Sequence, residues 1–155
     1  MKKLTLTIIF LILGIWLNAQ TITLSTDVRN AILGSEQTNF KPSSDLQLGI
    51  EWRENNVSVG LQIESFESIG YRDVFVQVGT YTNWKYSAFA SVGVGAVIRK
   101  GDRYFNNSFL TYDINVGLRR SFKSIEIGVI SNYNPRPDIN KPIISNYLSI
   151  GYKIQ

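Results

Sequence analysis

The 155-residue sequence contains no cysteine and no histidine. Without cysteine the chain has no disulfide framework, no thiolate nucleophile, no cysteine-ligated zinc or iron–sulfur site and no acylated N-terminal cysteine. Without histidine it lacks the usual general base and the commonest metal ligand. Both absences argue against an enzyme, and we expect no catalytic residues, no metal and no cofactor.

Charged residues are also scarce. They make up 18% of the chain, whereas hydrophobic residues make up an ordinary 44%. A soluble globular domain has about 25% charged residues. No apolar run reaches the roughly 20 residues of a membrane-spanning helix. The predicted fold must therefore explain why a chain of ordinary hydrophobicity has few charged residues.

The first 19 residues have the organisation of a secretory signal peptide. Lys2 and Lys3 form a positive start, an apolar segment of 14 residues runs from Leu4 to Leu17, and Ala19 is the small residue before the cut. We expect cleavage after Ala19, which leaves residues 20–155 as one exported domain. That domain keeps 14 basic and 12 acidic residues, and its small net charge indicates no nucleic-acid partner.

From residue 20 onward, apolar residues alternate with period two and no window shows helical spacing. Eight such segments follow one another, each about as long as the 9–11 residues of a tilted strand that crosses a bilayer. Strands of soluble proteins are commonly about five or six residues long. The alternating apolar residues that mark the eight segments lie within Ile22–Ile32, Leu46–Trp52, Val57–Ile63, Val74–Val78, Tyr86–Ile98, Leu110–Leu118, Ile125–Val129 and Ile144–Ile154.

The connections between these segments are alternately long and short. Long loops are predicted at 34–44, 65–72, 100–108 and 132–142, and tight turns at 53–56, 81–85 and 120–123. All four prolines fall in the first and last long loops, where none removes a hydrogen-bond donor from a strand interior. An even-stranded up-and-down barrel with both termini on one side of a membrane has this order.

Alternation alone does not say which face lies inside the barrel. A soluble exported lipocalin-like barrel that binds an apolar ligand would bury the apolar set. Glycine favours the opposite facing, because small residues relieve crowding inside a narrow eight-stranded barrel. The strand glycines all share the polar face: Gly49, Gly60, Gly79, Gly93, Gly95, Gly117, Gly128 and Gly151.

Charges within the strands lie on the polar face too. A charge that faces lipid costs about 2–4 kcal/mol near the bilayer midplane for Arg or Lys, whereas opposite charges inside a barrel pair with each other. We interpret the following residues as a structural charge network in the lumen: Asp27, Arg29, Glu51, Arg53, Lys85, Arg99, Asp113, Arg119, Glu126 and Lys153. Such a network fills the lumen, so a narrow channel is a less favoured alternative.

Together these features resemble the small outer-membrane β-barrels of the OmpA/OmpX type. The resemblance covers the whole mature chain, up to the closing strand Tyr147–Gln155, and it rests on pattern and not on a diagnostic motif. It implies an all-β, eight-stranded antiparallel up-and-down transmembrane β-barrel in the outer membrane of a Gram-negative bacterium, with periplasmic termini. Outer-membrane lipid or lipopolysaccharide and the outer-membrane insertion machinery are the implied partners. Members usually end in an aromatic residue, whereas this chain ends in Ile154 and Gln155.

For function we expect a non-enzymatic scaffold that presents four extracellular loops to a surface or envelope protein partner. A resemblance to enzymatic barrels of similar size would imply serine chemistry that depends on histidine, and this sequence has no histidine. A paired-carboxylate site among the lumen acids is less favoured, because carboxylates that face cations in a tight lumen are mostly structural. Loop residues that suit lipopolysaccharide phosphate or a protein are Lys100, Arg103, Tyr104, Phe105 and Arg136.

Overall fold

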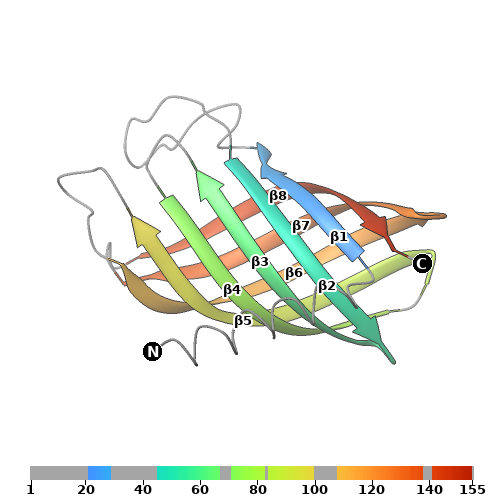
Figure 1. Ribbon diagram of the computed structural model, residues 1–155, viewed down its shortest axis with the longest axis horizontal. Helices are drawn as coiled ribbons and strands as arrows, with labels where there is room; N and C mark the ends of the chain where they lie inside the picture. The colour runs from blue at the N-terminus through green and yellow to red at the C-terminus, as the bar shows by residue number, and fades with distance from the viewer. Residues whose placement is uncertain are drawn as a thin grey trace, which may run out of the picture.

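The computed structural model describes residues 21–28, 45–66, 71–82, 84–99, 108–137 and 141–154. Within them lie eight strands: β1 (Thr21–Asp27), β2 (Asp45–Glu54), β3 (Val57–Phe66), β4 (Tyr71–Tyr81), β5 (Tyr86–Arg99), β6 (Phe109–Phe122), β7 (Ile125–Arg136) and β8 (Lys141–Lys153). Each strand pairs antiparallel with the next, and β1 pairs with β8, which closes the barrel (Figure 1). The predicted all-β, eight-stranded up-and-down barrel is confirmed. Over the described ranges, no helix has the length and apolar character needed to span a bilayer.

The two ends of the barrel differ. At one end, here called the turn end, short connections join β2 to β3, β4 to β5 and β6 to β7, and Thr21 of β1 pairs there with Lys153 of β8. Asn55 and Asn56 have φ values of 51° and 66°, as a two-residue hairpin turn requires. At the opposite end, the loop end, the chain passes between strands through residues outside the described ranges.

Alternate residues of every strand face the lumen and are mostly polar, while the other set faces outward and is mostly apolar. In β6, Asp113 and Asn115 are 0% and 2% exposed, whereas Ile114 and Val116 are 39% and 50% exposed. The other strands repeat this pattern with the parity that the sequence predicted, except that Ile50, which was predicted to face outward, is only 4% exposed. A lipocalin-like barrel would bury the apolar set, so the facing excludes that alternative.

Strand glycines lie where the lumen is crowded. A Cβ atom on Gly93 would overlap the Oδ1 atom of Asp113, and one on Gly117 would lie 2.5 Å from Cε1 of Phe89. The nearest atom to a Cβ on Gly49 is 3.6 Å away, which leaves room for a methyl group. At most of these positions only glycine fits, which agrees with the crowding inferred from the sequence.

The last hairpin is longer than the sequence predicted. The predicted loop 132–142 is wrong, because β7 runs to Arg136, β8 begins at Lys141, and Pro135 pairs with Pro142. The Thr111 hydroxyl donates to the Pro135 carbonyl oxygen at 2.8 Å, so that carbonyl points toward β6 and away from β8. Because the N and C=O of a strand residue point the same way, the missing N–H of Pro135 removes no bond between β7 and β8.

Two other predicted boundaries also change. The third strand includes Glu64 and continues to Phe66, and the fourth begins at Tyr71, so the loop predicted at 65–72 is shorter. β6 continues to Phe122, so Arg120 lies in a strand and not in the turn predicted at 120–123. In both cases most of the added strand residues, such as Glu64, Arg72 and Arg120, are polar, and polar residues had been assigned to loops.

Candidate functional site: the polar lumen

Polar side chains fill the lumen in three groups. The ion-pair layer, nearest the turn end, consists of Glu51, Arg53, Arg119, Glu126 and Lys153. The amide group consists of Gln62, Gln77, Asp113, Asn115 and Asn132. The acidic group, toward the loop end, consists of Asp27, Asp45, Glu64, Asp73 and Tyr147.

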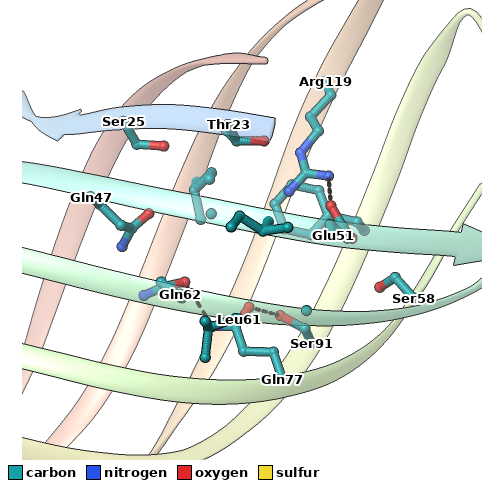
Figure 2. Close-up of a pocket in the computed structure, with 15 residues that line it drawn as sticks. Thr23, Ser25, Gln47, Glu51, Ser58, Leu61, Gln62, Gln77, Ser91 and Arg119 are labelled. Atoms are coloured by element: carbon teal, nitrogen blue, oxygen red, sulfur yellow. Dashed lines mark hydrogen bonds and ion pairs between the residues drawn. The ribbon is translucent and has the colours of Figure 1, made fainter. Parts of the chain in front are cut away.

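The ion-pair layer connects strands across the barrel. Glu51 Oε2 accepts hydrogen bonds from Arg53 Nη2 and Arg119 Nη1, both at 2.7 Å. Arg53 Nη1 also donates to Glu126 Oε2 at 2.8 Å. Because β2 and β6 lie on opposite sides of the closed ring, the bond between Glu51 and Arg119 crosses the lumen, as Figure 2 shows.

Three further contacts involve residues of the ion-pair layer. Lys153 Nζ lies 3.1 Å from Glu126 Oε1, and the Ser121 hydroxyl donates to the same oxygen at 3.0 Å. On the other side the Arg119 guanidinium lies 3.8 Å from the centre of the Phe89 ring. Charge-assisted hydrogen bonds of this length are strong, and a low local dielectric strengthens them further. The layer therefore fixes its side chains in one arrangement.

The ion-pair layer separates two cavities. The inner cavity has a volume of about 40 Å³ and is lined by Glu51 and Arg119 together with neutral residues such as Gln47 (Figure 2). A vestibule of about 600 Å³ lies at the turn end and is lined by Arg53 and Glu126, among others. The inner cavity has room for only a few water molecules. The two cavities share no lining residue, and the bonded side chains of the ion-pair layer lie between them.

The amide group is built around one carboxylate. Asp113 Oδ2 accepts hydrogen bonds from Gln77 at 2.9 Å, Asn115 at 2.9 Å and Asn132 at 3.1 Å. The Gln77 amide also donates to the Gln62 carbonyl oxygen at 2.7 Å. Three neutral donors thus hold this buried carboxylate, and the arrangement is typical of a structural polar network.

Of the acidic group, only Asp27 was predicted from the sequence to lie in the lumen. Tyr147 donates its hydroxyl to Glu64 Oε1 at 2.7 Å, and the Glu64 amide donates to Asp73 Oδ1 at 3.1 Å. Asp45 is fully buried in the same region. The period-two alternation places all of these residues inside once the predicted strands are extended to the observed strand ends. Among the described residues no set of three or more acidic side chains is arranged to hold a metal ion.

The structure places seven of the ten predicted lumen charges inside the barrel: Asp27, Glu51, Arg53, Asp113, Arg119, Glu126 and Lys153. Lys85 is different, because β5 begins at Tyr86 and the Lys85 side chain is exposed in the connection before it. The remaining predicted residues lie outside the described ranges, or have side chains that the structure does not describe: Arg29, Arg99, Lys100, Arg103, Tyr104, Phe105 and Arg136.

The fold is similar to that of solved outer-membrane barrels. The N-terminal β-barrel domain of OprF from Pseudomonas aeruginosa superposes with a TM-score of 0.64 at 9% identity, covering 88% of this chain and 98% of that one. The Yersinia pestis outer membrane protein Ail gives a TM-score of 0.53 at 16% identity, covering 87% and 99%. The outer membrane enzyme PagL gives 0.48 at 15% identity, covering 86% and 99%. No family model and no curated protein matches the sequence. At these identities the likeness to OprF and Ail shows a shared fold and nothing more.

Proposed function

We propose that the chain is a non-enzymatic β-barrel of a Gram-negative outer membrane, a rigid scaffold with a closed lumen. The observation that carries this proposal is the facing of the strands, with polar residues buried inside and apolar residues exposed outside. Soluble monomers rarely expose an apolar patch larger than a few hundred Å². In a bilayer these exposed apolar residues face lipid. The closed ladder of strands then satisfies the backbone hydrogen-bonding groups of every strand in the barrel wall. The shared fold with outer-membrane barrels supports this location.

The outer surface supports insertion in a second way. Tyr86 and Tyr152 are 59% and 58% exposed near the turn end, and Tyr112 is 45% exposed farther toward the loop end. Aromatic side chains gather at both interfaces of transmembrane barrels. The apolar residues between these levels, such as Val92 and Val116, would face the hydrocarbon core.

The proposed orientation puts the turn end in the periplasm and the loop end outside the cell. Export would use the predicted signal peptide, and β1 begins at Thr21, two residues after the proposed cut following Ala19. Thr21 pairs with Lys153 near the other terminus, so both ends of the mature chain lie on one side.

The lumen supports a scaffold better than the alternatives. General acid–base catalysis by two carboxylates needs environments that push their pKa values apart, whereas Glu51 and Glu126 are each bonded to two cations in one network. A steady pore would require the ion-pair layer to rearrange. We therefore propose that surface or envelope interactions are made by the connections at the loop end.

Membrane fractionation combined with gel mobility tests the location. The folded chain should sediment with outer membranes and migrate differently on SDS gels with and without heating. Recovery in the periplasmic supernatant would overturn the proposal. The orientation is tested separately by adding proteinase K to intact cells. Cleavage is expected within 100–107, and cleavage at the 55–56 turn would contradict the orientation.

A further inference from the structure

Arg120 faces outward near the turn end, on a surface that is otherwise apolar. It pairs with Tyr86 of β5, and even-numbered residues of this part of β6 point away from the lumen. The guanidinium carbon lies 5.2 Å from the centre of the Tyr86 ring and 4.5 Å from that of Phe122. The Nε atom is buried and has no hydrogen-bond partner. Among the described residues Arg120 also makes no ion pair.

Two exposed lysines lie near Arg120 in the adjoining connections. Lys85 precedes β5 and Lys123 follows β6, and the Ser121 amide donates to the Lys85 carbonyl oxygen at 3.2 Å. We call Lys85, Arg120 and Lys123 the turn-end basic cluster. The nearest acid in the flanking strand, Glu126, faces the lumen and is already ion-paired. No other acidic residue lies in β5, β6 or β7 except the inward-facing carboxylate of the amide group. Among the described residues of these three strands, no acidic side chain faces this part of the outer rim.

Aromatic residues fix the depth of the basic cluster. Phe122 is 45% exposed on the outer face, and Trp84 is 76% exposed in the connection between β4 and β5. Exposed aromatic rings of transmembrane barrels lie at the level of the lipid headgroups. Stacking on two rings holds the guanidinium in place while its terminal nitrogens remain available as donors. An arginine at this depth meets phosphate groups and not hydrocarbon.

We propose that the turn-end basic cluster binds the phosphate of an anionic phospholipid in the adjacent leaflet. Arg120 would bind the phosphate oxygens through its terminal nitrogens, since a guanidinium matches the geometry of phosphate. Lys85 and Lys123 add attraction to a negatively charged membrane surface. The site rests on the proposed membrane insertion, because phospholipid reaches this rim only when the barrel lies in a bilayer.

Native mass spectrometry of the full chain, folded in dodecyl maltoside micelles, tests the site by titration with phosphatidylglycerol. Arg120→Gln removes the charge and keeps a polar side chain of similar size. Arg72→Gln is the matched control, because Arg72 also faces outward but lies at the loop end. Wild type and Arg72→Gln should bind equally, while Arg120→Gln binds about five- to tenfold more weakly. Phe122→Leu, which removes one stacking ring, should weaken binding about two- to threefold.

Several outcomes would overturn the site: equal binding by Arg120→Gln and wild type, equal loss in Arg72→Gln, or equal binding of zwitterionic phosphatidylcholine. Displacement of the lipid by millimolar inorganic phosphate would show a free-anion site and overturn the assignment to lipid. Heat-modifiable migration of each variant confirms that it is folded. If wild type fails to insert into vesicles, the proposed function is wrong. If insertion is normal and binding is unselective, only the lipid site is wrong.

Discussion

Replacing Glu51 with Gln removes the one carboxylate that two arginines share. Arg53 Nη2 and Arg119 Nη1 both lie 2.7 Å from Glu51 Oε2. Arg53 keeps its bond to Glu126, whereas Arg119 keeps the contact with the Phe89 ring and only a longer-range attraction to Glu126. The variant therefore leaves a guanidinium that is 9% exposed without a direct ion-pair partner.

The size of the loss follows from burial. Two opposite charges about 4 Å apart attract by about 4 kcal/mol at an effective dielectric constant of 20, and Glu51 makes two such contacts. Desolvation of the three groups offsets much of this attraction, so we expect Glu51→Gln to lower the free energy of unfolding by about 3–5 kcal/mol. Glu126→Gln is the control. This variant leaves Arg53 paired with Glu51 and removes the ion pair of Lys153, whose side chain is 35% exposed. We therefore expect it to lower the free energy of unfolding by about 1–2 kcal/mol.

Urea titration in phospholipid vesicles, followed by heat-modifiable migration, measures both variants. With an m value of about 1–3 kcal/mol/M, Glu51→Gln should lower the urea midpoint by about 1–5 M. Adding Arg119→Gln should restore part of the stability, because the unpaired buried charge is then removed as well. A loss below about 1 kcal/mol, or a smaller loss than that of Glu126→Gln, would refute the reasoning.

The outer face, the crowded lumen and the separated cavities give three more predictions. Val92→Arg should cost about 2–4 kcal/mol and reduce the folded fraction in vesicles, while Val57→Arg beside a turn should cost under about 1 kcal/mol; equal losses would contradict the facing. Gly117→Ala should lower the free energy of unfolding in urea by about 1–3 kcal/mol, while Gly49→Ala changes it by less than about 0.5 kcal/mol; the reverse order would contradict the packing. In planar bilayers wild type should show no steady conductance, because the ion-pair layer, the amide group and the acidic group all fill the lumen; steady steps from wild type would show that the lumen is open.

The number and facing of the strands were predictable because both depend on local sequence. In an extended strand the side chain of residue i+2 lies on the same face as that of residue i. The alternation from Val92 to Ile98 therefore assigns a face to every residue of β5 without any knowledge of its neighbours. The same reasoning placed Asp113 and Glu126 inside the barrel.

The partners of the lumen charges were not predictable in this way. Arg119 and Glu51 are 68 residues apart, and their meeting depends on the stagger of the closed barrel, which parity does not contain. Asp45 and Asp73 were missed because strand limits were drawn at apolar residues, whereas both are polar residues near a strand end that face the lumen. Arg120 was assigned to a turn for the same reason, and its outward direction became visible only with the full length of β6.

The last hairpin has a consequence for how neighbouring molecules meet. Within the described residues the ladder between β6 and β7 ends at Tyr133 and the ladder between β1 and β8 ends at Tyr147, while β7 and β8 stay paired as far as Arg136 and Lys141. A strand edge outside its ladder is a template for pairing with another chain. Pro135 and Pro142 have no N–H to offer at these edges, and the Pro135 carbonyl already accepts a hydrogen bond from the Thr111 hydroxyl of β6. The two prolines thus protect the hairpin against edge-to-edge aggregation where these ladders have ended.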